Sequence, residues 1–503
     1  MHNTGPSRLN ALLTNRWLLA ALIAVPMTSA ALTAKMSFDE AIWAYIGGGW
    51  FGEGAKPYVE RFDNKPPGVL LVFGLSDLAA GASVWPARLA GVLAMVSTGL
   101  VLYAIGRRLL GRTAGALAMI LLGMMLPRDV FDGPYAAHTE SFMILFSTLA
   151  FYFLLRAFSA GRTARYLREL FLAWLSVGVA TFCFKQIALC TAAGLLAFYL
   201  LNRKSAGGKA HWPRDLAVAA GALGASIILA VAPLAVSGVQ AGEYGRAVWA
   251  SLFQAGAANT SLSDRFAECL RTWRHGEFLV FAPLLAVFLA QWKKLHSAAV
   301  PMAGIAAWLI ADFVGANASG NYYGHQLKQV LPPLALASSL GLCALFRTTD
   351  ATADRACGRS LTAVALAVLL LMPYGTLLTC LSVRPQEDPD RELGTWIRNH
   401  STPADSVFPC GPRSMQILAW SGRKTPFRYF NLMFLPLPGA EAEIDAGLAH
   451  SPPRYLILPA EGTKELLPRE RAIADRLARM IESSYTPRLA RNGYCVYERT
   501  PRP

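Results

Sequence analysis

Apolar runs of roughly 18 to 22 residues recur along most of this chain, the length that an α-helix needs to cross a bilayer. Short polar stretches separate these runs. The pattern predicts about eleven membrane-spanning helices joined by polar loops. The predicted helices cover residues 17–34, 84–105, 113–127, 140–156, 170–184, 187–202, 216–238, 277–291, 298–315, 327–346 and 361–382.

Two shorter apolar segments follow the first predicted span. Residues 39–50 place Ile42, Tyr45 and Ile46 on one side of a helix, and residues 66–80 begin with two prolines. Both are too short to cross a bilayer. We therefore expect interfacial helices in this first outer loop, the second of them interfacial or re-entrant.

The basic residues are distributed unevenly between the two sets of loops. Loops on the side of the N-terminus hold 18 Lys and Arg in 66 residues, whereas the opposite loops hold 11 in 95. An excess of Lys and Arg marks the cytoplasmic side. The pattern predicts a cytoplasmic N-terminus, and an odd number of helices then places the end of the chain outside.

The composition changes near residue 384, because 31 of the last 120 residues are charged, close to a soluble average. The predicted elements there are helices at 392–399 and 469–481 and strands at 406–408, 455–458 and 494–497. The predicted fold is an α-helical polytopic membrane domain, residues 1–383, followed by a small extracytoplasmic α/β domain, residues 384–503.

Overall composition agrees with a membrane protein, since 54% of the residues are hydrophobic and only 16% are charged. The net charge of +15 lies in short loops and indicates topology rather than nucleic-acid binding. The run after Arg16 also resembles a cleavable signal peptide; we favour an uncleaved first helix because the topology requires it. Cys410 and Cys495 form a disulfide or stay free thiols.

Polar residues that could carry chemistry begin directly after the first span. Asp39 and Glu40 could supply a general base at the membrane surface, but acids also suit the first turn of a helix. Lys65, held beside two prolines, could bind a phosphate or extend to the lipid headgroups.

Further polar side chains fall on the same predicted outer side of the membrane. A charge such as Lys185 at this depth needs a partner or a water-filled cavity. Each residue alone could be an interfacial anchor, and together they favour a shared cavity. They are Arg88, His138, Glu140, Lys185, Tyr323, His325 and Lys328.

At these residues the chain resembles the bacterial GT-C glycosyltransferase superfamily, closest to family-39-like enzymes related to protein O-mannosyltransferases and the lipid A aminoarabinose transferase. The resemblance covers about residues 15–340. Its specific part is the Asp-Glu pair followed by Lys-Pro-Pro. The matching elements are Asp39-Glu40, Pro57-Tyr58, Lys65-Pro66-Pro67, Ala87-Arg88-Leu89, His138-Thr139-Glu140, Lys185-Gln186 and the run from His325 to Pro332.

The resemblance implies an inverting transferase that takes a sugar from a polyprenyl-phosphate donor. Asp39 would be the general base and Glu140 a second catalytic acid. The donor phosphate would be bound by Lys65, Arg88 and Lys185. A substrate cavity would include Glu40, Tyr45, Tyr58, His138, Tyr323, His325 and Lys328.

The resemblance also has departures and leaves partners open. Asn64 stands where the aminoarabinose transferase has an acid that helps to hold a metal, so we expect neither a metal site nor a cofactor. The implied partners are the polyprenyl-phosphate-linked donor, membrane lipid and an acceptor of unknown class, which could be lipid, glycan or protein. The implied location is the outer face of a bacterial inner membrane. The alternative is a transporter or flippase of lipid-linked sugars, which the absence of a visible internal repeat disfavours.

Overall fold

The computed structural model describes most of the chain and divides it into two compact units. The first, here the helical unit, is Met1–Ala34, Arg88–Ala230 and Asn259–Val383; the second, here the mixed unit, is Lys35–Ala87, Val231–Ala258 and Arg384–Pro503. Apart from isolated positions, the described residues are 12–127, 137–161, 163–205, 212–250, 281–292, 299–318, 323–346, 388–411, 413–460 and 473–500.

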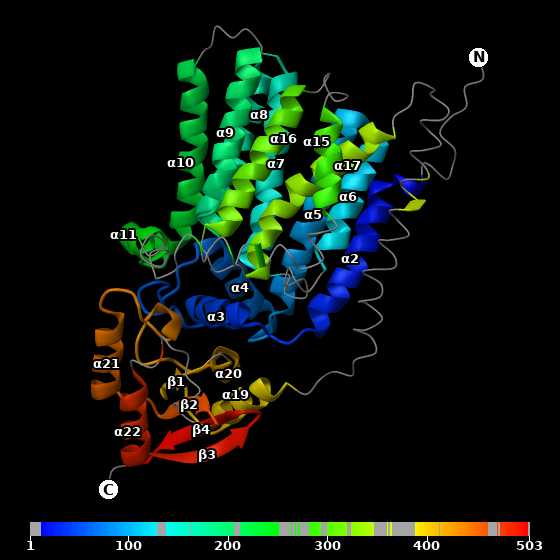
Figure 1. Cartoon of the computed structure of the whole chain (residues 1–503). Coiled ribbons are helices and arrows are strands. Elements are labelled where there is room, and N and C mark those ends of the chain that lie inside the picture. The colour runs from blue at the N-terminus through cyan, green and yellow to red at the C-terminus, as the bar shows by residue number, and fades with distance from the viewer. Residues whose placement is uncertain are drawn as a thin grey trace, which may run out of the picture. The chain divides into compact units, whose positions relative to one another are not determined.

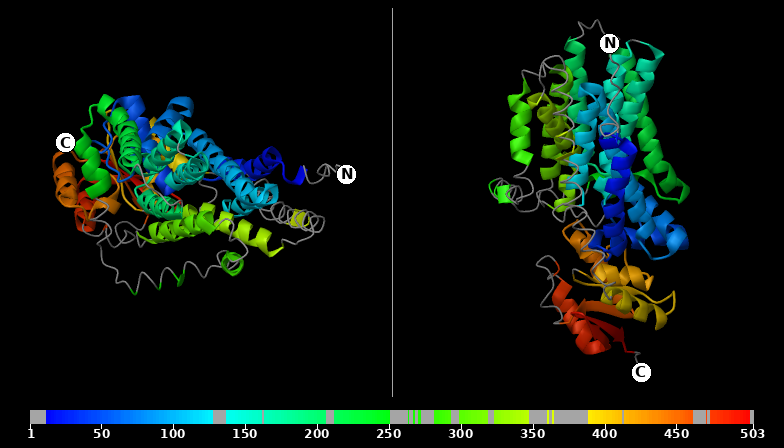
Figure 2. Two further views of the ribbon diagram at one scale, coloured as in Figure 1. Left: turned by 90° about the horizontal axis from the view of Figure 1, so that it is seen from above. Right: turned by 90° about the vertical axis from the view of Figure 1, so that its right-hand side faces the viewer.

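Among the described residues, seven helices are long and apolar enough to cross a membrane. In Figure 1 and in the right-hand view of Figure 2, the long helices of the helical unit run in roughly one direction. The seven are α2 (Arg16–Thr33), α5 (Trp85–Leu110), α7 (Thr139–Ser159), α8 (Ala164–Val179, continued to Phe184), α10 (Trp212–Val236), α16 (Ala299–Asn317) and η6 with α17 (Gly324–Val330 and Leu331–Leu345).

Three further predicted spans correspond to shorter helices. These are α6 (Arg112–Met125), α9 (Ala188–Ser205) and α15 (Phe281–Ala290). The predicted span at 361–382 lies outside the described residues. The chain is therefore a polytopic membrane protein, as predicted, while the count of eleven spans stays a prediction.

Packing in the helical unit joins helices that are consecutive in the chain and helices that are far apart in sequence. Helix α9 packs against α16, and α7 packs against α8. The Phe151 ring stacks on Phe198 and on Trp308, with centroids 5.1 and 5.0 Å apart. Since aromatic side chains bury large apolar areas, this stack links α7, α9 and α16 into one core.

The mixed unit begins with two short helices, α3 (Phe38–Gly48) and α4 (Pro67–Ala80). Both segments were predicted to be helical, and Ile42, Tyr45 and Ile46 are buried on α3, as expected. A Cβ on Gly47 would lie 2.5 Å from Gly74 N, on α4. Glycine is therefore required where the backbones of α3 and α4 approach each other.

The C-terminal part of the mixed unit contains a four-stranded sheet in the order β1-β2-β4-β3. β1 and β2 are parallel, and the other pairs are antiparallel. The three predicted strands correspond to β1, β2 and β4. The sequence prediction missed β3, although Asn492 and Gly493, both with positive φ, form the Asn-Gly turn typical of a tight hairpin. The strands are β1 (Val407–Pro409), β2 (Tyr455–Pro459), β3 (Tyr485–Arg491) and β4 (Tyr494–Arg499).

Four helices accompany this sheet, and α19 begins where Pro389 follows the N-cap Asp388, whose side chain accepts from Arg391 N. Helices α19 and α22 were predicted, whereas α20 and α21 were not. Cys410 and Cys495 are buried free thiols. The helices are α19 (Pro389–Asn399), α20 (Ser414–Ser421), α21 (Ala440–His450) and α22 (Ala474–Ser484).

Residues 35–87 and the C-terminal segment share one core within the mixed unit. Thr425 N donates to the Tyr45 hydroxyl at 2.9 Å, and Tyr45 packs edge-on against Phe430. Phe62 N donates to Arg428 O at 3.0 Å. The predicted boundary at residue 383 stays a prediction, but folding of residues 388–500 as seen here includes contacts with residues 35–87.

Candidate functional site

The N-terminus of α3 presents the predicted base. Ser37 and Glu40 form a capping box, in which Ser37 N donates to Glu40 Oε2 at 3.0 Å. Glu40 is fully buried and Asp39 is half-buried. The two acids therefore differ, because the Glu40 carboxylate accepts a hydrogen bond from the backbone at the start of α3 and Asp39 remains partly exposed. The assignment of Glu40 to a substrate cavity stays a prediction.

The turn before α4 presents Lys65 through a network of hydrogen bonds. The buried Asp63 carboxylate accepts from Trp43 Nε1 at 2.9 Å and from Asn64 N at 2.7 Å. Lys65 Nζ donates to Asn64 Oδ1 at 2.9 Å. Because Trp43 is on α3, the Asp63 carboxylate ties the lysine turn to the helix that carries Asp39.

Burial and neighbouring charges shift the pKa of the Asp63 carboxyl. Burial raises the pKa of the Asp63 carboxyl, and the Asp39 carboxylate raises this pKa further. Lys65, the Asn64 N–H and the Trp43 indole oppose these effects. The mixed unit thus links the helix that carries the half-buried Asp39 to the turn that carries Lys65, while their shared site stays a prediction.

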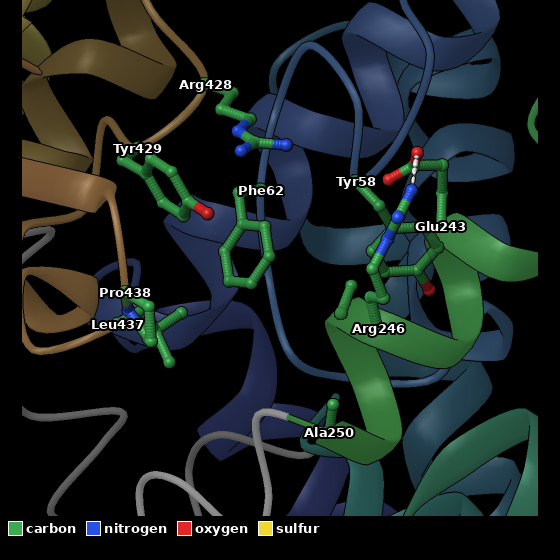
Figure 3. A pocket seen from close by; sticks show the side chains of 10 residues that line it. Tyr58, Phe62, Glu243, Arg246, Ala250, Arg428, Tyr429, Leu437 and Pro438 are labelled. Carbon is green, nitrogen blue, oxygen red and sulfur yellow. Dashed lines mark hydrogen bonds and ion pairs between the residues drawn. The ribbon is translucent and has the colours of Figure 1, made fainter. Parts of the chain in front are cut away.

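Two of the three tyrosines predicted for a substrate cavity, Tyr45 and Tyr58, have different places in the mixed unit. Tyr45 is buried, and the Arg61 guanidinium lies 4.0 Å from its ring centroid, so its role here is packing. Tyr58 has φ of 67°, unusual for a residue with a side chain. Its hydroxyl donates to Lys65 O at 2.9 Å, and the residue lines a cavity (Figure 3).

The helical unit pairs two residues for which separate roles were predicted. Glu140, at the start of α7, forms an ion pair with Lys185, and both side chains are buried. Thr139 Oγ1 also donates to Glu140, at 2.8 Å. The prediction that Lys185 needs a partner at this depth is confirmed, and the partner is the predicted second acid.

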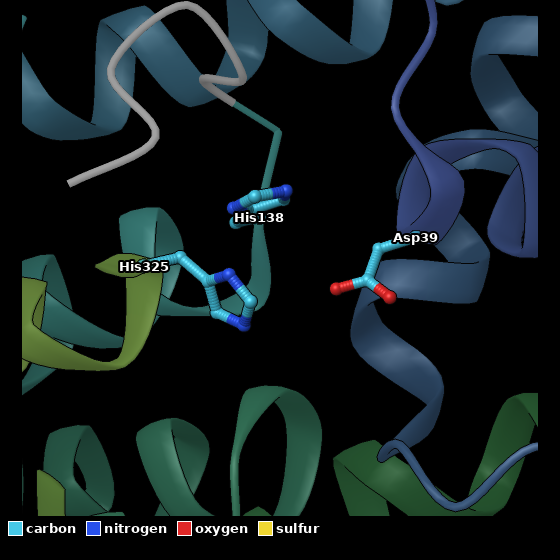
Figure 4. A group of neighbouring side chains, drawn as sticks. All are labelled: Asp39, His138 and His325. Carbon is cyan, nitrogen blue, oxygen red and sulfur yellow. The ribbon is translucent and has the colours of Figure 1, made fainter. Parts of the chain in front are cut away.

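Two predicted imidazoles also meet in the helical unit. The centroids of the His138 and His325 rings are 4.5 Å apart, and Figure 4 shows both side chains. Burial lowers the pKa of His138 well below its usual value, and the electrostatic effects of its neighbours His325 and Lys328 lower it further. His138 is therefore neutral at pH 7.

Two imidazoles this close are also an arrangement that can share a metal ion when both rings are neutral. The ligand nitrogens of His138 and His325 lie within 4.8 Å of each other. The expectation of a metal-free and cofactor-free protein stays a prediction. Tyr323 stacks on His325 with centroids 5.6 Å apart, and Lys328 is fully buried in η6.

Arg88, which was predicted to bind the donor phosphate, is buried against the backbone of α2. It is buried, and its Nη1 donates at 2.7 Å to the carbonyls of Ala31 and Ala34, at the end of α2. These carbonyls lack partners within their own helix. This contact makes Arg88 a cap for α2, and its binding of donor phosphate stays a prediction.

The structure identifies polar residues that sequence reasoning did not assign. Asp63 lies two residues before the Lys-Pro-Pro motif in the sequence, but its burial could not be read from the sequence. Asp312, in α16, is fully buried and accepts from Thr191 and from Gln329 Nε2, the latter at 2.9 Å. An acid inside a predicted span was a signal available in the sequence, because such residues are costly and usually functional.

With this geometry established, comparison with known proteins identifies the fold. Residues 64–234 match the family model described as dolichyl-phosphate-mannose-protein mannosyltransferase. Comparison with curated protein sequences gives no match.

Solved structures match nearly the whole chain. ArnT from Cupriavidus metallidurans bound to undecaprenyl phosphate is 16% identical with a TM-score of 0.68, covering 96% of this chain and 97% of that one. The archaeal oligosaccharyltransferase AglB from Archaeoglobus fulgidus, in complex with an inhibitory peptide and a dolichol-phosphate, is 13% identical with a TM-score of 0.57, covering 96% and 74%. The predicted GT-C-like fold, helical membrane part and small C-terminal sheet together, is confirmed.

Proposed function

We propose that this protein is an inverting glycosyltransferase that moves a sugar from a polyprenyl-phosphate donor to an acceptor at the outer face of a bacterial inner membrane. The observation that carries the proposal is a chain of hydrogen bonds in the mixed unit. Trp43, on the helix that carries Asp39, donates to Asp63, which also accepts from Asn64 N, and Lys65 Nζ donates to Asn64 Oδ1. A carboxylate and a fixed ammonium are the two groups that such a transfer requires.

The chemistry assigns one role to each of these groups. Asp39 accepts the proton of an acceptor hydroxyl as the hydroxyl oxygen bonds to the anomeric carbon. The bond between that carbon and the phosphate oxygen breaks, and polyprenyl phosphate leaves with the bonding electrons. Lys65 stabilises the negative charge that develops on this phosphate.

The matched structures support the lipid carrier. The ArnT structure is bound to undecaprenyl phosphate, and the AglB structure is in complex with a dolichol-phosphate. We propose a carrier of this class as the donor's lipid, delivered from the bilayer. Glu140 and Lys185, which pair in the helical unit, are proposed to assist at the acceptor and the phosphate, as the resemblance implies.

The test uses membranes from a bacterial host that contain equal amounts of wild type, Asp39→Asn or Glu60→Gln. Glu60 is an exposed acid of the same loop and serves as the matched control. Transfer of labelled sugar from a polyprenyl-phosphate donor panel is followed by mass spectrometry of the products. The transfer rate of Asp39→Asn should be lower than that of wild type by about 100-fold or more, the contribution that a general base usually makes to a rate. Glu60→Gln should transfer at the wild-type rate. Equal transfer by all three would refute the assigned base.

A further inference from the structure

A cavity of about 510 Å³ lies within the mixed unit, apart from the side chains assigned above to the reaction. Figure 3 shows residues 243–250 on one wall and 428–438 on the other, with Phe62 between them. Its volume falls in the range of small-molecule sites. We propose that this cavity binds an uncharged sugar unit of the acceptor glycan, an inference that rests on the proposed transferase function.

The aromatic lining favours a sugar ring. Tyr58, Phe62 and Tyr429 all line the cavity, and the Phe62 and Tyr429 rings are 4.8 Å apart and tilted by 48°. The axial C–H bonds of a pyranose carry partial positive charge, and aromatic faces carry partial negative charge. Rings set at an angle offer such a face to a sugar that enters between the walls.

The charged lining favours an uncharged ligand over a phosphorylated one. Arg246 forms an ion pair with Glu243, and Arg428 Nε lies 2.8 Å from Glu443 Oε2. Each guanidinium is thus accompanied by a carboxylate, so the two pairs add no net charge to the walls. A sugar hydroxyl can accept from an arginine and donate to Glu243. A phosphate would meet the Glu243 carboxylate in the lining, and Arg428 is already paired with Glu443, which lies outside the lining.

The Tyr429 hydroxyl adds a neutral donor to this lining. Burial raises the pKa of Tyr429, and the carboxylates of Glu443 and Glu243 raise it further, against the effect of Arg428. The hydroxyl therefore stays protonated at neutral pH. A fixed donor beside an aromatic face suits recognition of a hydroxyl-rich ring.

The cavity is connected to the lysine turn by Tyr58. This residue lines the cavity and donates from its hydroxyl to Lys65 O at 2.9 Å. Its left-handed backbone, φ 67°, costs energy in a residue with a Cβ, and such strain persists where surrounding structure enforces it. A sugar held against Tyr58 would lie beside the loop that presents Lys65, as an acceptor must.

The experiment measures binding without any donor, on the full chain in detergent micelles. Saturation-transfer NMR is recorded with the methyl glycosides of glucose, mannose, galactose and N-acetylglucosamine, and with glucose 6-phosphate as the anionic probe. We expect at least one methyl glycoside to bind and glucose 6-phosphate to bind more weakly. Tyr429→Ala should weaken the binding about fivefold or more by removing an aromatic face, and Tyr429→Phe should retain most of it.

Tyr497→Ala removes a partly exposed tyrosine of β4, outside the cavity lining, and should leave binding unchanged. The inference is overturned if no methyl glycoside binds, if glucose 6-phosphate binds more tightly, or if Tyr429→Ala binds like wild type. Because no donor is present, the result is independent of the transfer assay. Equal transfer by wild type and Asp39→Asn, with glycoside binding intact, would contradict the proposed reaction and leave this inference standing.

Discussion

The hydrogen bond between Trp43 and Asp63 is the contact whose removal should show most clearly how the lysine turn is held. Trp43 Nε1 donates to the buried Asp63 Oδ2 at 2.9 Å, and Asn64 N donates to Oδ1 at 2.7 Å. Asp63→Asn puts an amide NH₂ opposite one of these donors. A buried donor without an acceptor costs about 1 to 3 kcal/mol, so we expect a loss of about 2 kcal/mol in the free energy of unfolding.

A double-mutant cycle isolates the bond itself. Trp43→Phe removes the indole donor and leaves the carboxylate in place. A hydrogen bond to a charged group contributes about 1.5 to 3 kcal/mol, so the double variant should be more stable than the sum of the single losses predicts, by about that amount. The free energies come from equilibrium unfolding in mixed micelles with increasing SDS.

The control pair is Asp63→Asn with Trp50→Phe, since the Trp50 indole donates to Ser237 rather than to Asp63. Those two losses should add within about 0.5 kcal/mol, as expected for sites without a shared partner. The reasoning is refuted if the Trp43 and Asp63 variants are also additive within that margin. Such a result would mean that another contact holds the lysine turn.

Three further predictions concern the described residues. The pKa of Asp63 is higher in the native state than in the unfolded chain. The free energy of unfolding should therefore fall as the pH rises through this raised pKa. Asp63→Asn should remove that pH dependence in melting curves recorded across pH. Gly47→Ala places a Cβ 2.5 Å from Gly74 N and should lower the free energy of unfolding in SDS by about 1 to 3 kcal/mol. The control Gly224→Ala, with open space around its Cβ, should not lower it. Equal effects of the two variants would refute the close approach of α3 and α4. Lys185→Met leaves Glu140 buried without its ion-pair partner and should lower the free energy of unfolding by about 3 to 5 kcal/mol. Adding Glu140→Gln to the same chain should restore part of that free energy. If SDS unfolding shows no restoration, the result counts against the ion pair.

Local pattern was sufficient to predict the elements that depend on near neighbours. The apolar runs gave the long helices, and Ser37 with Glu40 had the spacing of a capping box. The missed strand β3 belongs to the same class, because Asn492-Gly493 is a local hairpin signal. These features depend on interactions between residues a few positions apart, so they can be predicted from the sequence alone.

The sequence also determined which residues to test, but the tertiary structure decided what each one contacts. The Glu140–Lys185 pair joins residues 45 positions apart, and Arg88 reaches carbonyls more than 50 positions away. Charge and burial at such sites depend on groups brought together only by packing. That is why the Lys-Pro-Pro motif pointed to Lys65, whereas the carboxylate that holds the motif against α3, that of Asp63, became apparent only in the fold.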